Sequence, residues 1–432
     1  MTMRYVNGMI DVFLIYWLFV ASSALLPLLV LGSASRDLAP EGAALLRLLI
    51  LPSLAMMPLL VLSRHRDMLM LLLGNPFLVL LLIWIWCSVM WSVAPDITIR
   101  RALGFTTYTL LACYLALRHD YRWIIKVLAW MALFVLSLSV VFVIVLPSYG
   151  LMYDGRGIRG VFTHKNGMGG FVVLSIAVLM STFKDRLIPK GAALFGLVIS
   201  AAMLPLVNSA TATVVALALF AVYSAWWLLA YSLRLAIIIG LLGAAATSLI
   251  SLLTFVYLDE IFALLGRDLT FTGRTGVWAY VWEMIKKQWV FGYGYEAFWQ
   301  IEAHLRYAAN SLQWDVPNSH SGFLETFLGL GIVGLGLFLA LVGTMIYRIA
   351  HALGRGDFQP AGLLLVLLSA YLLRGAFEAN FLGQNSIMWV LLVTFSVALS
   401  PGLRRDRKES SLKSSQRRQA SEPVQLQALK ST

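Results

Sequence analysis

The chain of 432 residues is strongly apolar, since 60 % of its residues are hydrophobic and only 12 % are charged. Its mean hydropathy is +0.82, whereas about a quarter of the residues in an ordinary soluble domain are charged. This composition excludes a single soluble core and predicts an all-α polytopic membrane protein, because so much apolar surface needs a bilayer to cover it.

The net charge of +12 comes in large part from the segment after Pro401. Basic residues that follow a last membrane span mark the cytoplasmic side and contact anionic lipid, so we expect membrane lipid as a partner and no nucleic acid. We therefore divide the chain into a transmembrane domain at 1–402 and a disordered basic cytoplasmic tail at 403–432. The basic residues of the tail are Arg404, Arg405, Arg407, Lys408, Lys413, Arg417, Arg418 and Lys430.

Apolar runs of about 20 residues, the length that crosses the hydrocarbon as a helix, occur about twelve times along the chain. The first run is long for a secretion signal and only Arg4 precedes it, so it predicts an uncleaved first span. Cys87 and Cys113 fall inside apolar runs and indicate neither a disulfide framework nor a metal site. The expected spans are 12–31, 43–62, 76–94, 102–118, 124–147, 167–183, 191–207, 211–230, 235–257, 321–347, 361–380 and 385–400.

The distribution of basic residues predicts the orientation of these spans. An even number of spans puts both termini on one side, and lysine and arginine prefer cytoplasmic loops. With the N-terminus inside, about 20 of the 33 lysines and arginines lie in cytoplasmic segments. We therefore expect a multi-pass protein of the bacterial inner membrane with both termini cytoplasmic.

The segment 258–320 is the one long loop expected on the outer, periplasmic side. It is rich in aromatic residues, in which disordered linkers are poor, so we expect it to contain short helices. Trp278, Trp282, Ile285 and Trp289 recur at the spacing of one helix face. Such a helix either lies along the headgroup region, where Trp is favoured, or packs on the rest of the loop.

Three polar segments on the expected outer side are candidates for chemistry. The first joins the fifth and sixth spans and places cations among glycines. Glycine lets backbone N–H groups approach a ligand closely, and the cations pair with phosphate. A loop with solvated charges is the alternative, although basic clusters are disfavoured in a short outer loop. The candidate residues of this segment are Arg156, Arg159, His164, Lys165 and Asn166.

The second segment, from Thr272 to Trp278, opens the predicted helix of the long loop. Thr272 or Thr275 is suited to cap the first turn. Arg274 then lies beside the positive end of the helix, where anions bind. Arg274 is therefore a functional candidate, and an interfacial anchor is the alternative.

The third segment, from Pro317 to Glu325, leads from the long loop back into the membrane. His320 lies at the mouth of a span among small polar residues, and an imidazole there can take up a proton near neutral pH. The alternative is a histidine that is hydrogen-bonded at a helix start. Arg374 and Glu378 form an i, i+4 pair at the outer end of the eleventh span, where ionisable residues are usually functional or paired.

Motifs of several other enzyme classes are absent from the sequence. There is no Asp-x-Asp of metal-dependent sugar transferases, no phosphate loop of the Gly-x4-Gly-Lys-Ser/Thr type and no His-Glu-x-x-His. ATP hydrolysis and zinc proteolysis are therefore not expected, and we predict neither a metal nor another cofactor.

The three segments, in this order and spacing, resemble the O-antigen ligase and exopolysaccharide polymerase (Wzy-type) superfamily, particularly its ExoQ-like members. One departure is Trp289, where family members usually carry Pro, and it affects loop geometry rather than chemistry. The similar motifs are Arg159-Gly-Val-Phe-x-His-Lys-Asn166, Gly273-Arg274-Thr275-x-x-Trp278, Gly292-Tyr293-Gly294 with Phe298, and Asn318-Ser319-His320-Ser321 followed by Leu328-Gly-Leu-Gly331.

The resemblance implies a metal-independent glycosyltransferase whose donor is an undecaprenyl-pyrophosphate-linked oligosaccharide and whose acceptor is a second glycan. It implies that Arg274 and His320 are catalytic. Other membrane proteins of polysaccharide assembly are further candidate partners. The residues expected to bind pyrophosphate or glycan are Arg156, Arg159, His164, Lys165, Asn166 and Arg374.

Within the superfamily, the motifs favour polymerisation of exopolysaccharide repeat units, and a ligase that transfers the glycan to lipid A core or another acceptor is the alternative. A polysaccharide transporter or flippase would carry polar residues near mid-membrane and paired halves. Here the polar residues collect at one face instead. A purely structural assembly subunit would not need the outer Arg and His residues.

Overall fold

The computed structural model describes residues 2–25, 28, 48–152, 155–229, 274–302, 304, 316 and 318–400. All regular structure in these ranges is helical, apart from one isolated bridge between Leu151 and Ile158. The helices are α1 (Thr2–Ala21), α4 (Leu51–Ser63), α5 (His65–Leu73), α6 (Pro76–Cys87), α7 (Pro95–Arg118), α8 (Tyr121–Val145), α9 (Pro147–Gly150), α10 (Lys165–Asp185), α11 (Lys190–Val207), α12 (Ala210–Leu229), α15 (Arg274–Lys287), α17 (Gly322–Gly354), α18 (Phe358–Phe377) and α19 (Ile387–Ala398), with 3₁₀ turns at Ser88–Trp91 and Phe298–Gln300.

Five helices of the described part are long and apolar enough to cross a membrane: α8, α10, α11, α17 and α18. A sixth span results if α5 is joined to α6 and its 3₁₀ turn, which together bend by 96°. The helical membrane fold is therefore confirmed, whereas the number of twelve spans stays a prediction. The expected span at 235–257 and the expected tail at 403–432 lie outside the described residues.

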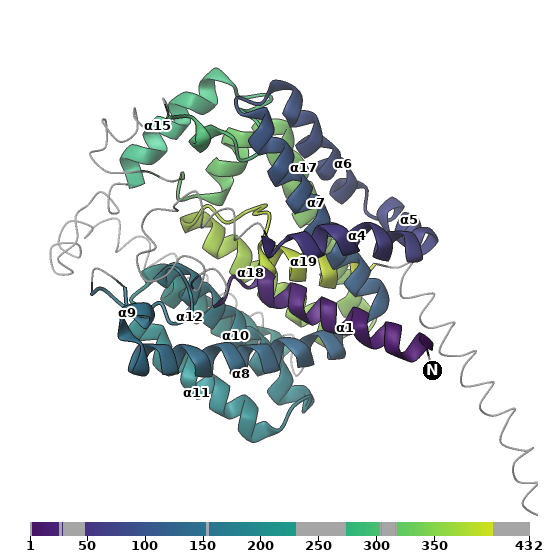
Figure 1. Cartoon of the computed structure of the whole chain (residues 1–432), viewed down its shortest axis with the longest axis vertical. Coiled ribbons are helices and arrows are strands. Elements are labelled where there is room, and N and C mark those ends of the chain that lie inside the picture. Colours follow the sequence, from purple (N-terminus) through teal and green to yellow (C-terminus); the bar gives the residue numbers. More distant parts are fainter. Residues whose placement is uncertain are drawn as a thin grey trace, which may run out of the picture.

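Two groups of helices flank α18 and α19 (Figure 1). Helices α6, α7, α15 and α17 lie on one side, and α8, α10, α11 and α12 lie on the other. Helix α18 contacts α17 of the first group and both α10 and α12 of the second. The helix pair α18–α19 therefore connects the two groups.

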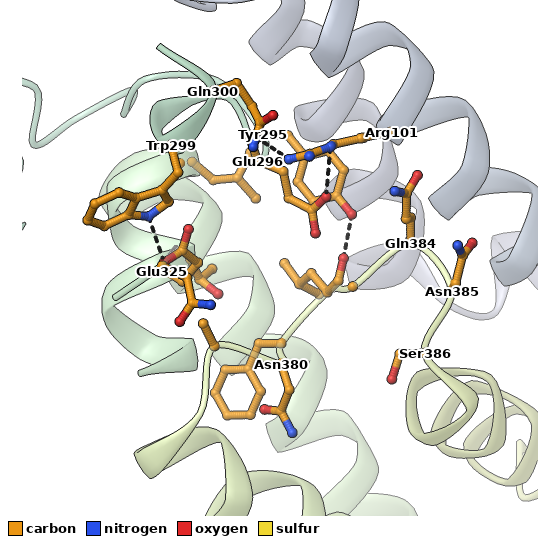
Figure 2. Close-up of a pocket in the computed structure, with 18 of the residues that line it drawn as sticks. Arg101, Tyr295, Glu296, Trp299, Gln300, Glu325, Asn380, Gln384, Asn385 and Ser386 are labelled. Atoms are coloured by element: carbon orange, nitrogen blue, oxygen red, sulfur yellow. Dashed lines mark hydrogen bonds and ion pairs between the residues drawn. The ribbon is translucent and has the colours of Figure 1, made fainter. Parts of the chain in front are cut away.

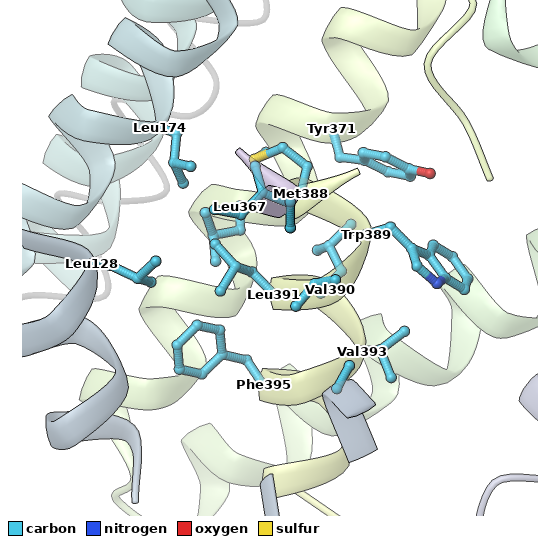
Figure 3. Close-up of a cluster of buried hydrophobic side chains, with 14 of the residues drawn as sticks. Leu128, Leu174, Leu367, Tyr371, Met388, Trp389, Val390, Leu391, Val393 and Phe395 are labelled. Atoms are coloured by element: carbon cyan, nitrogen blue, oxygen red, sulfur yellow. The ribbon is translucent and has the colours of Figure 1, made fainter. Parts of the chain in front are cut away.

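Helix α19 lies at the centre of the apolar core (Figure 3). It is apolar on every side, which is typical of a helix buried all round, and its residues from 387 to 397 are all buried. Leu128 of α8, Leu174 of α10 and Leu367 of α18 lie around it in one apolar cluster. On its other side, Trp389 Nε1 donates a hydrogen bond of 2.9 Å to Thr109 Oγ1 of α7. This buried helix therefore packs between α7 and α18.

Helix α17 is the longest described helix, with 33 residues. At 1.5 Å per residue its two parts, before and after Gly331, together rise about 50 Å, which exceeds the roughly 30 Å of the hydrocarbon. It bends at Gly331, where φ is 67° and ψ is −172°, a conformation that is essentially restricted to glycine. The bend separates a short first part, which follows the third polar segment, from a longer second part.

Candidate functional site

The Gly-x-Gly turn of the long loop packs against the bend in α17. Tyr293 N donates a hydrogen bond to the carbonyl of Leu328, and Gly294 N donates one to the carbonyl of Gly329, both at 2.9 Å. The bend leaves these carbonyls without helical partners, and the turn supplies the donors. Two of the motifs that carry the resemblance are therefore in direct contact.

The helix predicted in the long loop is present as α15. Its buried face consists of Val277, Val281 and Ile285, which pack on other residues of the loop and on α17. Trp282 and Trp289 of the predicted face are instead 47 % and 57 % exposed. Packing on the rest of the loop is therefore confirmed, and a place in the headgroup region for the exposed tryptophans stays a prediction.

The first turn of α15 and the third polar segment lie side by side. Arg274 is the first residue of α15 and precedes Trp278 by one helical turn. Trp278 Nε1 donates a hydrogen bond of 2.9 Å to the carbonyl of Ser319, the residue before His320. The two segments that carry the predicted catalytic residues are thus joined by a direct contact.

His320 sits on a turn that several hydrogen bonds hold in place. Its backbone N donates to Asn318 Oδ1 at 3.0 Å, and Ser319 Oγ donates to the carbonyl of Ser321 at 2.8 Å. The side chain of Ser321 caps the start of α17. His320 has a φ of 52°, in the left-handed region that is uncommon for residues other than glycine.

Glu325, in the first turn of α17, hydrogen-bonds to the backbone of the turn that carries His320. Its Oε2 accepts hydrogen bonds from Ser319 N at 3.0 Å and from Trp299 Nε1 at 3.2 Å. One carboxylate thus joins the turn of His320 to the 3₁₀ turn that ends the Gly-x-Gly region. The sequence identified Glu325 only as the end of the third segment, because its two partners are set by the fold.

The buried side chain of Arg159 hydrogen-bonds to the backbone of the first polar segment and of the residues before it. Its side chain is fully buried, and its guanidinium donates to the carbonyls of Tyr149 at 2.8 Å, Ser148 at 3.2 Å and Thr163 at 3.4 Å. Burial also lowers the pKa of Arg159. In this conformation its donors serve the loop, so the expected contact between Arg159 and pyrophosphate stays a prediction.

The other residues of the first segment lie nearer the surface. Arg156 and His164 are exposed, whereas Lys165 and Asn166 are half-buried. Lys165 Nζ donates a hydrogen bond of 2.9 Å to the carbonyl of Arg156. His164 Nδ1 accepts one of 3.1 Å from Asn166 N and so caps the start of α10. Lys165, the first residue of α10, is therefore tied to the backbone of the loop at Arg156.

Arg374 is brought to this first segment across the helix interface. Its Nη2 donates a hydrogen bond of 3.1 Å to the carbonyl of Asn166, and its Nε pairs with Glu378 Oε2 at 2.7 Å. Its guanidinium passes directly over Gly170 of α10, where an added Cβ would lie 2.0 Å from Nη1. Hydrogen bonds therefore connect Arg374, Asn166, Lys165 and the backbone of Arg156 in one cluster, which does not include the guanidinium of Arg159.

Phe381 joins this cluster to the turn of His320. A Cβ added to Gly375, next to Arg374, would lie 1.9 Å from the ring, and one added to Gly322, two residues after His320, would lie 2.6 Å from it. The ring thus packs directly on α18 and on the start of α17. The predicted residues are divided between two neighbouring groups that share this aromatic contact.

A polar cavity opens beside the turn of His320 (Figure 2). Its volume is about 450 Å³, and it lies between the start of α7, the start of α17, the loop after the Gly-x-Gly turn and the connection from α18 to α19. The polar side chains that line it include Arg101, Glu296, Gln300, Asn318, Glu325, Asn380, Gln384, Asn385 and Ser386. Except for Asn318 and Glu325, which border His320, these residues were not identified from the sequence.

One residue of this cavity, Arg101, could have been selected from the sequence. Arg101 lies at the expected outer end of a span, so the criterion that selected Arg374 also applies to it. By contrast, polar residues in short loops, such as Asn380 and Asn385, are ordinary until the fold brings them together. The cavity as a whole therefore required the tertiary structure.

Glu296 is the most perturbed acid of the cavity. Burial raises the pKa of Glu296 to about 7, with a smaller contribution from Glu325, while the charge of Arg101 opposes the rise. Arg101 Nε lies 3.5 Å from Glu296 Oε2. Burial also raises the pKa of the neighbouring Tyr295, whose hydroxyl donates to the carbonyl of Leu382. A carboxyl group with such a pKa changes its charge near neutral pH.

The described part of the chain therefore defines a helical membrane protein with cations, a histidine turn and a polar cavity gathered near the same helix ends. Among the described residues, no three His, Cys, Asp or Glu side chains form a group suited to a metal ion. Metal independence nevertheless remains a proposal.

Residues 195–339 match the profile of the family described as O-Antigen ligase. The similarity of these residues to the family confirms the resemblance to the O-antigen ligase and polymerase superfamily. The match covers about a third of the chain and includes both Arg274 and His320. It supports an enzyme that transfers glycans from lipid-linked substrates. A comparison with curated proteins finds no match.

Proposed function

We propose that this protein polymerises exopolysaccharide repeat units at the periplasmic face of the bacterial inner membrane, by glycosyl transfer from an undecaprenyl-pyrophosphate-linked donor. The observation that carries the proposal is the contact between α15, which begins at Arg274, and the turn of His320. The family match over this region supports the same function. In the expected orientation, both segments face the periplasm.

The donor pyrophosphate would be bound by the outer cations. Arg156, Lys165 and Arg374 belong to one cluster at the start of α10, and Arg274 opens α15, where the helix dipole favours an anion. Negative charge grows on the pyrophosphate as it leaves, so these cations stabilise the transition state more than the bound donor. Fixed cations supply the charge stabilisation, so the proposed reaction is metal-independent.

His320 would act on the acceptor. Its imidazole takes the proton of an acceptor hydroxyl while that oxygen attacks the anomeric carbon of the donor sugar. The bond between the anomeric carbon and the pyrophosphate oxygen breaks, and undecaprenyl pyrophosphate leaves with the bonding electrons. The hydrogen bonds of the turn fix the backbone of His320, which supports a defined position for its side chain.

A ligase is the second candidate, and the description of the matching family favours it. The two reactions share a donor and differ in the acceptor, which is a lipid-linked repeat for a polymerase and lipid A core or another carrier for a ligase. A transporter or flippase is a lesser candidate, because it needs no histidine turn beside a cation.

The test is the surface-polysaccharide profile of a deletion strain that expresses wild-type protein, Arg274→Ala or His320→Ala. We expect both variants to lose polymer and accumulate single lipid-linked repeats. Lys286→Ala is the matched control, because Lys286 is a cation of the same helix with an exposed ion pair to Glu283. Long polymer that is no longer attached to its carrier would indicate a ligase, and an unchanged profile would reject glycosyl transfer.

A further inference from the structure

The peptide group that joins Ser319 to His320 is held at both of its ends. Its carbonyl oxygen accepts the hydrogen bond of 2.9 Å from Trp278 Nε1, and its N–H, which belongs to His320, donates to Asn318 Oδ1 at 3.0 Å. Ser319 is fully buried. A peptide group is a rigid plane, so fixing its two polar ends helps to set the direction in which the side chain of His320 leaves the backbone.

Glu325 holds the preceding peptide group from the side of α17. Its Oε2 accepts the N–H of Ser319 at 3.0 Å and the indole N–H of Trp299 at 3.2 Å. Trp299 is buried in the apolar cluster that also contains the buried face of α15. One carboxyl oxygen therefore ties the backbone just before His320 to the packed interior of the long loop.

The beginning of α17 does not require these contacts of Glu325. Ser321 already caps the helix by accepting a hydrogen bond from Leu324 N. An acidic residue in a first turn is favoured by the helix dipole, but the dipole does not select two N–H donors outside the helix. One of these donors, Trp299, lies 26 residues earlier in the chain. The side chain of Glu325 thus serves the turn and the loop rather than its own helix.

We propose that Glu325 is a positioning residue for the glycosyl transfer, because by holding Ser319 and Trp299 it fixes the backbone from which the imidazole of His320 acts. The inference rests on the proposed function and adds a residue that acts through the base. A base must stay within hydrogen-bond reach of the proton that it removes. Loss of the contacts therefore lowers turnover and leaves the affinity for the donor pyrophosphate, which is assigned to the cations, unchanged.

Polymer formation by the purified full chain in nanodiscs, supplied with lipid-linked repeats, measures turnover. Glu325→Leu removes the acceptor of both N–H groups. We expect kcat to fall about 30-fold or more, because small displacements of a catalytic group are costly. Affinity for undecaprenyl pyrophosphate, measured by native mass spectrometry, should stay at the wild-type value. An unchanged kcat, or an affinity that falls in proportion to kcat, would overturn the proposal.

Glu283→Leu is the matched control for this substitution. Glu283 is an exposed glutamate of α15 whose carboxylate pairs with Lys286, so it makes no contact with the turn of His320. Its replacement should keep both kcat and the affinity for undecaprenyl pyrophosphate. An equal loss of kcat in Glu283→Leu and Glu325→Leu would show a general effect of removing acidic residues and would contradict a specific role of Glu325.

Glu325→Gln separates position from charge. The amide of glutamine keeps an oxygen that accepts both N–H groups, and its hydrogen bonds are roughly half as strong as those of a carboxylate, so we expect kcat within about threefold of the wild type. The pH dependence of kcat should also be that of the wild type, since His320 still takes up the proton. A loss as large as in Glu325→Leu, or the loss of one limb of the pH profile, would mean that the carboxyl group itself transfers a proton and would reject a positioning role.

Trp299→Phe covers the case in which Glu325→Leu does not fold. Phenylalanine keeps most of the ring packing but has no N–H group, so Glu325 loses one of its two partners. We expect kcat to fall about fivefold, the effect of one hydrogen bond, with the affinity for undecaprenyl pyrophosphate unchanged. A kcat equal to that of the wild type would contradict the proposal.

Arg274→Ala and His320→Ala in the same assay distinguish this inference from the function on which it rests. Loss of product in both variants, with full turnover of Glu325→Leu, would reject the positioning role alone. Wild-type turnover of both variants would reject glycosyl transfer at this site, and the role of Glu325 with it. Loss in all three variants together with rescue by Glu325→Gln supports both.

Discussion

Arg159 and Arg374 are both arginines of the expected outer side, but their guanidinium groups have different partners. Arg159 is buried and donates to three backbone carbonyls of its own loop. Arg374 pairs with Glu378 and reaches a single carbonyl of the neighbouring segment. We therefore expect Arg159 to act mainly on stability and Arg374 to act mainly on activity.

Replacement of Arg159 by Lys should lower the free energy of unfolding by about 1–2 kcal/mol, because a single ammonium cannot serve all three backbone carbonyls that the buried guanidinium holds. The midpoint of thermal unfolding in detergent measures this change. Arg156→Lys is the control, since Arg156 is an exposed arginine of the same loop. An unchanged midpoint for Arg159→Lys with a weakened affinity for donor would instead show that Arg159 binds phosphate.

Replacement of Gly170 by Ala should displace the guanidinium of Arg374, because the new Cβ would lie 2.0 Å from Nη1. The protein should still fold, since the clashing atom is the end of a flexible side chain. We expect the rate of polymer formation to fall about tenfold through loss of positioning. Gly191→Ala, where an added Cβ meets open space, should keep full activity. Full activity of Gly170→Ala would show that the contact of Arg374 is dispensable.

Glu296 should make stability depend on pH in a defined direction. Its folded-state pKa of about 7 lies above the ordinary value of 4.5, so the folded state binds more protons between these values. Its contribution to stability therefore falls as pH rises from about 4.5 to about 7. The groups facing it are Arg101 of α7, Glu325 of α17 and the adjacent Tyr295.

Glu296→Gln tests this sign, because glutamine mimics the neutral acid. At pH 8 the variant should unfold at a higher temperature than the wild type, and the difference should shrink toward pH 5. Thermal unfolding in detergent across this range is the measurement. A variant that is less stable than the wild type at pH 8 would mean that the ion pair with Arg101 outweighs the cost of burial.

At the scale of elements, the sequence predicted the long apolar helices well. The five helices α8, α10, α11, α17 and α18 correspond to expected spans, because a long apolar run in a membrane has few alternatives to a helix. The bend of α17 was not predicted, since it depends on a turn about forty residues earlier along the chain. The face of α15 that packs on the loop consists of Val277, Val281 and Ile285, and of these only Ile285 belongs to the tryptophan face noted in the sequence.

The bend itself gives a sharp prediction at this scale. Gly331 has a φ of 67°, and an added Cβ would lie 2.0 Å from the carbonyl oxygen of Val290. Gly331→Ala should therefore destabilise the protein by about 3 kcal/mol or more, through backbone strain and overpacking. Gly336→Ala, in the same helix with open space around it, should be neutral or stabilising. Equal unfolding midpoints for the two variants would contradict the docking of the loop on the bend.

The part of the site that was predicted from the sequence consists of ionisable residues, because such residues are energetically unfavourable in or beside a membrane and therefore stand out. Cations and a histidine on the expected outer side of a membrane protein are informative from sequence. The fold brings Arg374 to the first segment and α15 to the turn of His320, while the roles of these residues stay predictions. The cavity was not predictable, because Glu296, Asn380 and Asn385 acquire meaning only when the fold brings them to one cavity. Burial of a polar atom is a property of the fold, not of a motif.

At the scale of the whole molecule, the buried α19 and its partner α18 place two groups of helices around one reaction region. The cation cluster at α10 and the turn of His320 at α17 belong to different groups, and Phe381 packs between them. The proposed donor cations thus come from both groups, since Arg274 opens α15, whereas the proposed base, His320, belongs to the group of α17. The membrane presents the lipid-linked donor to both.

The most direct measurement is polymer formation by the purified full chain in nanodiscs, supplied with lipid-linked repeats extracted from the deletion strain. We predict that polymer and free undecaprenyl pyrophosphate appear together in the presence of a metal chelator. Arg274→Ala and His320→Ala should each slow both products by about 100-fold or more. Release of neither product by the wild-type protein, or equal rates in wild type and variants, would contradict glycosyl transfer at this site.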